Sequence, residues 1–153
     1  MKVGSTTFLR AVIYLIGLAV VGVCIILVGN MVGGNPGIYL PIMLGLLITS
    51  VPFFYALYQG LNLLSYIDKN TAFSDSSIAA IQKIKYCAFS ISILYALLMP
   101  FIIYVADKDD APGAPLVALV IMSAFFVTGV FVEVLQRLFQ SAMDIKKEND
   151  LTV

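Results

Sequence analysis

The sequence predicts an all-α integral membrane protein whose four transmembrane helices form a bundle. Residues 11–32, 38–67, 86–106 and 111–132 contain no Asp, Glu, Lys or Arg. Each run is long enough to cross a hydrocarbon core about 30 Å thick, which takes roughly 20 helical residues. The chain is 61% hydrophobic and 12% charged, whereas soluble domains carry about 25% charged residues. A water-soluble fold of this length could not bury so much apolar surface around one core.

The basic residues predict the orientation of the four spans, which we place at about 9–32, 38–66, 84–106 and 112–138. Relative to the four uncharged runs, eight of the nine lie before the first, between the second and third, or after the fourth: Lys2, Arg10, Lys69, Lys83, Lys85, Arg137, Lys146 and Lys147. Lys108 alone lies in another connection. The positive-inside rule therefore predicts a multi-pass protein of the cell membrane, with both termini, the loop 67–83 and the tail 141–153 in the cytoplasm.

The first span is expected to stay in the mature protein, because its apolar run is longer than that of a signal peptide and no A-x-A-like cleavage site follows it. Residues 29–37, rich in Gly, Asn and Pro, predict a turn-rich external connection. Pro41 and Pro52 are expected inside the second span, where a proline bends the helix axis. Cys24 and Cys87 are interpreted as packing residues near opposite ends of their spans, too far apart for a disulfide.

The central loop predicts a helix start. Ser74 is a suitable N-cap, and Asp75 in the first turn favours the positive end of the helix dipole. Phe73 and Ile78 have the spacing of a hydrophobic staple. We expect a short amphipathic helix from here into the third span, which would rest on the bundle as a helix extension, lie against lipid headgroups or dock a partner.

A faint repeat links the two halves of the chain. Gly34-x-Pro36 recurs as Gly113-x-Pro115, each before a span that runs from outside to inside. Two repeated hairpins would explain it, and so would a shared requirement for a helix start near the outer surface. Small residues at four-residue spacing, Gly29 with Gly33 and Gly45 with Thr49, are typical of helix packing and weakly favour a homo-oligomer.

Polar residues gather at the predicted inner ends of the second and fourth spans. Gln59 and Asn62 lie on one span, and Glu133 and Arg137 lie on the other with the i,i+4 spacing of a helical ion pair. A buried pair would be costly and functional, whereas a pair at the interface would anchor the helix. These four residues form our candidate inner-face polar cluster.

Enzymatic activity finds no support in the sequence. The chain has no histidine, the commonest general base and metal ligand. It carries no phosphate-binding loop and no hydrolase or metalloprotease motif, and residues 107–110 lack the ligand pattern of a calcium loop and are expected to form a solvated acidic loop. We therefore expect a protein that is not an enzyme, with no catalytic residue, no metal site and no cofactor.

Two stretches resemble the domain of unknown function 2975 family, small four-span bacterial membrane proteins. Residues 66–74 read YIDKNTAFS, with Ala72 where the family has a proline. Residues 133–142 read EVLQRLFQSA, and the chain ends in ENDLTV at 148–153, the most specific match. The resemblance covers nearly the whole chain and implies a bacterial inner-membrane location.

Members of this family are often encoded beside small helix-turn-helix regulators, so the resemblance implies a membrane partner of a DNA-binding protein. The chain has no basic patch for direct nucleic-acid contact. The candidate cytoplasmic docking residues lie in the central loop and the tail: Phe73, Ser74, Asp75, Asp144, Glu148 and Asp150. The leading hypothesis is a non-enzymatic regulatory or sensory partner in the lipid bilayer. The alternative is a small transporter or channel subunit that uses the inner-face cluster, and a membrane-protecting immunity protein is a weaker third option.

Overall fold

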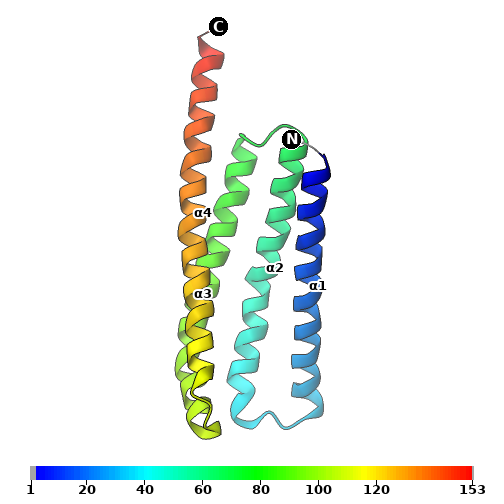
Figure 1. The fold of residues 1–153 in the computed structure, drawn as a ribbon, viewed down its shortest axis with the longest axis vertical. Helices are drawn as coiled ribbons and strands as arrows, with labels where there is room; N and C mark the ends of the chain where they lie inside the picture. The colour runs from blue at the N-terminus through cyan, green and yellow to red at the C-terminus, as the bar shows by residue number, and fades with distance from the viewer. Residues whose placement is uncertain (1–2, 153) are drawn as a thin grey trace.

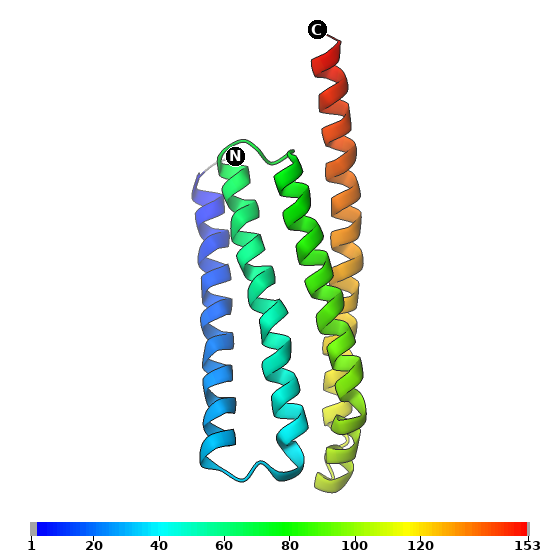
Figure 2. The same ribbon diagram turned by 180° about the vertical axis from the view of Figure 1, so that it is seen from behind.

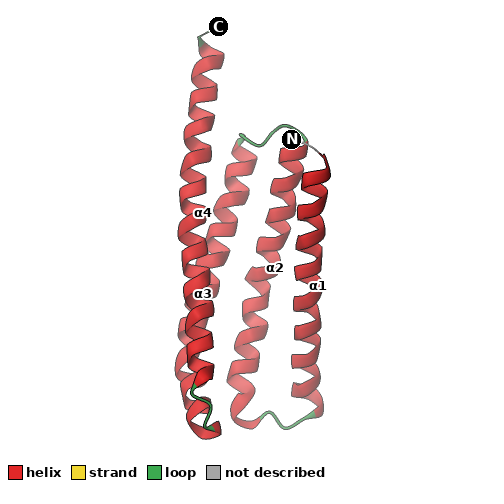
Figure 3. Ribbon diagram, in the orientation of Figure 1, coloured by secondary structure: helices red, strands yellow, loops and turns green. Residues whose placement is uncertain are grey.

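Helices account for almost the whole molecule. The structure, a computed structural model, describes residues 3–152. Its elements are α1 (Val3–Gly33), the short 3-10 helix η1 (Gly37–Tyr39), α2 (Leu40–Asp68), α3 (Asp75–Asp109) and α4 (Gly113–Leu151), shown in Figures 1 and 3. All four α-helices are long and apolar enough to cross a membrane. The predicted class, an all-helical four-span protein, is confirmed.

The helices run alternately up and down. The two ends of the described chain lie at the same end of the molecule as the α2–α3 loop, and the other two connections lie at the opposite end (Figures 1 and 2). We call the first of these the terminal end. Helix α3 packs against both α2 and α4, whereas α1 packs mainly against α2. Many large apolar side chains of α1 are exposed, as expected for a helix surrounded by lipid.

Two glycines permit the close approach of α3 to its neighbours. A Cβ at Gly45 of α2 would clash with the Leu98 side chain of α3, and one at Gly129 of α4 would lie 2.8 Å from Phe89 Cε1. The packing role predicted for Gly45 is therefore confirmed. The same prediction for Gly29 and Gly33 is wrong within the described chain, since a Cβ at either would lie more than 4 Å from every atom of the other helices.

Two boundaries of the first hairpin differ from the prediction. Residues 29–33 continue α1 instead of forming a loop, and the Gly34 N–H bonds to the Asn30 carbonyl at 3.1 Å. The backbone of Gly and Asn tolerates a helix as well as a turn, so these residues alone could not mark the boundary. Pro41 lies in the first turn of α2, where its missing N–H has no partner to lose, whereas Pro52 lies in the helix interior as predicted.

The second hairpin is longer than the predicted spans. The side chain of Ser74 accepts a hydrogen bond from the Ser77 N–H at 3.3 Å, which confirms the predicted N-cap. The expected amphipathic helix forms the first turns of a continuous α3. Helix α3 also includes residues 107–109 of the predicted acidic loop, and the C-cap residue that follows it, Asp110, has a left-handed φ of 53°. Cys24 and Cys87 are free, as predicted.

Candidate functional site

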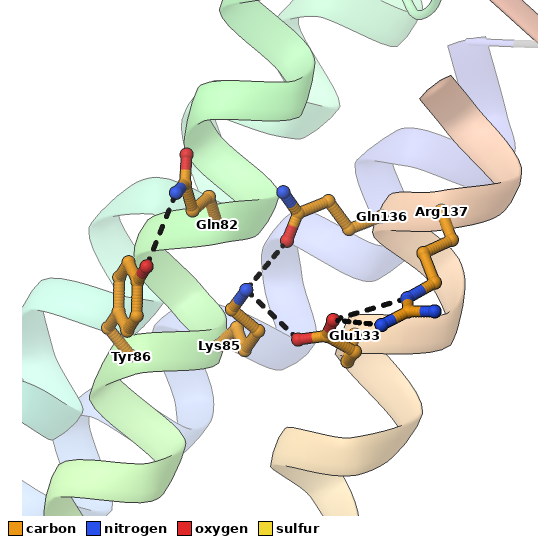
Figure 4. A network of polar contacts seen from close by, with 6 residues as sticks. All are labelled: Gln82, Lys85, Tyr86, Glu133, Gln136 and Arg137. Atoms are coloured by element: carbon orange, nitrogen blue, oxygen red, sulfur yellow. Dashed lines mark hydrogen bonds and ion pairs between the residues drawn. The ribbon is translucent and has the colours of Figure 1, made fainter. Parts of the chain in front are cut away.

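A network of polar contacts joins α3 to α4 (Figure 4), and its α3 member Lys85 lies in the half of that helix nearer the terminal end. The Lys85 ammonium lies 3.0 Å from Glu133 Oε2 and donates to Gln136 Oε1 at 3.0 Å. Glu133 Oε1 also accepts from the Nε and a terminal nitrogen of Arg137, each at 3.2 Å. The predicted i,i+4 pair of Glu133 and Arg137 is therefore present, as the outer half of a larger network.

Burial differs sharply across this network. The Lys85 side chain is 11% exposed, that of Glu133 36% and that of Arg137 79%. Lys85 Nζ also lies 4.9 Å from the centroid of the Tyr86 ring, within reach of a cation–π contact. Glu133 therefore connects a buried cation on α3 to an exposed cation on its own helix, and the network fixes the register of α3 against α4.

Sequence reasoning missed Lys85, which we counted only as a basic residue near the central loop. The signal was present in its spacing. Ile78, Ile81, Lys85, Ala88 and Ser92 recur at steps of three and four residues, and all five are buried. Such a stripe faces a neighbouring helix, so Lys85 replaces an apolar residue on the packed face. A lysine at that position needs a partner across the interface.

The predicted inner-face cluster does not form a single group. Gln59 and Asn62 line a hollow of about 440 Å³ between α2 and α3, whereas Glu133 and Arg137 lie on α4 and bind Lys85. No hydrogen bond or ion pair within residues 6–152 joins the two pairs. The physical reason is that α3 packs against both α2 and α4 and presents a different face to each.

A second ionic contact connects α1 to α2 at the terminal end. A terminal nitrogen of Arg10 lies 2.9 Å from Asp68 Oδ2 and donates to Ser65 Oγ at 3.0 Å. Both charged side chains are about one-third exposed, at 33% and 32%. This end of the molecule therefore carries an interhelical polar contact in each hairpin.

Helix α4 extends beyond the other helices (Figures 1 and 2). Met143 is its last buried residue, and every residue from 144 to 152 is exposed. We call residues 144–152 the projecting segment. It is helical up to Leu151 and carries the predicted docking residues Asp144, Glu148 and Asp150. Asp144 accepts a hydrogen bond from Gln140 Nε2 at 3.2 Å, within α4 itself.

The predicted docking residues of the central loop lie beside α4. The ring centroid of Phe73 is 5.3 Å from that of Phe139, and the Phe73 side chain remains 46% exposed. Ser74 caps α3 through its side chain, and Asp75 is exposed in the first turn. The central loop therefore contacts α4 at Phe139, five residues before the projecting segment begins.

Comparison with known proteins gives two matches. Residues 34–153 match the family described as "Protein of unknown function (DUF2975)". Over 156 aligned residues, the chain is 46% identical to a Bacillus subtilis (strain 168) protein named "Uncharacterized membrane protein YoaS", and the alignment covers 97% of this chain and 98% of that protein. No solved structure matches the chain.

Proposed function

The chain belongs to the DUF2975 family, and from that premise we propose that it is a non-enzymatic regulatory or sensory protein of the membrane. Its binding surface for a cytoplasmic partner consists of the projecting segment and the adjoining loop around Phe73. The observation that carries the proposal is that α4 continues as a helix past Met143, where every residue is exposed.

The chemistry of the projecting segment supports a protein partner. Ile145 is 61% exposed and Leu151 is 86% exposed, between charged residues of both signs. An isolated helix with few apolar contacts gains little stability from its own sequence in water. Leu138 and Ile145 are both exposed and lie seven residues apart, on one face of α4, and this is a spacing at which the apolar anchors of a helix bind a groove in another protein.

The side of the membrane follows from charge. The terminal end carries all the basic residues of the described chain except Lys108, so the positive-inside rule puts it in the cytoplasm. A small helix-turn-helix regulator, the partner that the family resemblance implies, would meet the projecting segment there. Reporter fusions at residue 153 and in the connection at residue 35 test the orientation. Activity of a periplasm-dependent reporter at residue 153 would overturn it.

Affinity purification from native membranes in mild detergent tests the binding surface. The full chain is compared with a variant that lacks residues 144–153, and with Lys108→Gln as a control at the opposite end. We expect a helix-turn-helix protein at stoichiometric amounts with the full chain and the control, and its loss with the truncated chain, which still inserts in the membrane. Equal recovery with the truncated chain would exclude the projecting segment as the docking site.

A transporter or channel subunit is the second candidate. A cavity of about 200 Å³ in the middle of the bundle favours it, since residues of all four helices line the cavity, among them Cys24, Ser50, Tyr95 and Phe125. This candidate predicts that Glu133→Gln changes solute or ion flux in proteoliposomes. Identical flux through vesicles with the native chain, the variant and no protein would count against it.

A further inference from the structure

The hollow between α2 and α3 has the composition of a binding site for an anionic group. Its lining includes Lys83 and Ser76 from α3 and the amides of Gln59 and Asn62 from α2, but no Asp or Glu. One cation and several neutral donors without a competing carboxylate are what a phosphate group requires. The hollow holds about 440 Å³, enough for a lipid headgroup.

Gln59 gives the hollow a polar residue that is almost fully buried. Its side chain is nine-tenths buried, at 6% exposed, and it makes no hydrogen bond to any other described residue. No polar side-chain atom of the described residues is fully buried without a partner, so the unpaired amide atoms of Gln59 remain accessible. Because Gln59 lines the hollow, its N–H groups can donate to a phosphate oxygen that lies there.

The position of the hollow along α2 coincides with the edge of a bilayer. Its α2 residues run from Tyr55 to Tyr66, that is from 15 to 26 residues after Leu40. At 1.5 Å per residue this is about 22–39 Å from the start of the helix, and the hydrocarbon core ends after about 30 Å. Three tyrosines, at positions 55, 58 and 66, line the hollow, and tyrosine is enriched at the level of lipid headgroups.

The interface between α2 and α3 also provides a path for an acyl chain. Farther from the terminal end, an apolar hollow of about 240 Å³ lies between α2 and α3 and is lined by residues such as Ile48, Leu94 and Leu97. Residues 48 and 55 are seven apart and residues 83 and 94 are eleven apart, so both hollows lie on the same face of each helix. A phospholipid whose phosphate lies at Lys83 would extend its acyl chain along the interface between α2 and α3.

We propose that the hollow between α2 and α3 binds the phosphate of an anionic phospholipid, with Lys83 as the cation and Gln59 and Asn62 as donors. This site is separate from the projecting segment and does not depend on the partner proposed above. Lys83 has no hydrogen bond or ion pair with the rest of residues 6–152, so the ligand would be its counter-ion.

Native mass spectrometry of the purified full chain in detergent tests the site. Phosphatidylglycerol and phosphatidylcholine with identical chains are added in equal amounts, and the variants are Lys83→Gln, Asn62→Ala and the matched control Lys147→Gln on the projecting segment. We expect one retained phosphatidylglycerol per chain, with affinity about fivefold lower in Lys83→Gln, also lower in Asn62→Ala, and unchanged in Lys147→Gln. Retention of both lipids alike, or equal loss in all three variants, would overturn the proposal.

A second arm separates the lipid from the free anion. Inorganic phosphate is titrated against the detergent-solubilised chain while tyrosine fluorescence is recorded, a signal without interference because the chain has eight tyrosines and no tryptophan. No response that depends on Lys83 is expected, since the acyl chain of the lipid, which lies between α2 and α3, contributes to the affinity and inorganic phosphate lacks it. A response lost in Lys83→Gln and equal in strength to the effect of phosphatidylglycerol would overturn the assignment to a lipid. Circular dichroism of each variant confirms that it is folded.

Discussion

Replacement of Gly129 by Ala tests the tight contact between α3 and α4. The new methyl group would lie 2.8 Å, 2.9 Å and 3.0 Å from the Cε1, Cδ1 and Cζ atoms of the Phe89 ring. Relief requires the ring or the helix to move by most of an ångström. The ring has little room, because Phe126 packs on it with centroids 5.8 Å apart.

The size of the effect follows from the cost of overpacking. An extra carbon in a well-packed interface costs about 1–3 kcal/mol. Alanine also stabilises a helix more than glycine does, and this gain in stability would conceal part of the cost of overpacking. Gly22→Ala is the matched control. It brings the same gain in helix stability inside α1, but no atom of another helix lies within 4 Å of its new methyl group. We therefore expect Gly129→Ala to be less stable than Gly22→Ala by about 1–3 kcal/mol.

The assay is reversible unfolding in mixed micelles with a rising fraction of sodium dodecyl sulfate, followed by circular dichroism. A double variant provides the decisive comparison, because Phe89→Ala removes the ring and should remove the penalty of the new methyl group. Equal stability of Gly129→Ala and Gly22→Ala, or a penalty that persists without the Phe89 ring, would refute the close packing described here.

Three further substitutions are tested by the same unfolding assay. Ser74→Ala removes the cap of α3 and should cost about 1 kcal/mol, whereas Ser74→Asp should keep the stability, and equal loss in both would rule out capping as the cause. Lys85→Met leaves Glu133 without its buried partner, so it should lower the unfolding midpoint while Lys147→Met leaves it unchanged; no difference between them would show that the interhelical pair does not stabilise the fold. Arg10→Ala breaks a pair whose side chains are one-third exposed, so it should cost less than about 1 kcal/mol, and a larger loss would show that this contact holds α1 in place.

The fold class could be predicted because it depends on a property of long windows. Four uncharged runs allow few alternatives in a bilayer, where the backbone must satisfy its own hydrogen bonds. The cap at Ser74 could be predicted because capping is local. The start of the connection between α1 and α2 could not be predicted, since residues 29–33 favour a turn in water and yet continue helix α1 here.

The candidate site was less accessible to sequence reasoning. The i,i+4 pair of Glu133 and Arg137 is a local feature and was found. The stronger partner, Lys85, lies 48 positions from Glu133 in the sequence, and only the packing of α3 on α4 brings the two together. The separation of Gln59 and Asn62 from Glu133 and Arg137 could not be predicted for the same reason, because the sequence does not show which face of α3 meets each neighbour.

The length and continuity of α4 make it a lever arm. Beyond Pro115 it contains no proline, and beyond Gly129 no glycine, so it lacks the usual causes of a kink. From Glu133, where Lys85 holds it, to Leu151 are 18 residues, or about 27 Å. Spanning helices adjust their tilt to the thickness of the bilayer. A tilt of roughly 10° about the Lys85 contact would carry the tip of α4 through about 5 Å at that length, so a small change in the thickness of the bilayer would become a displacement of several ångströms at the proposed binding surface.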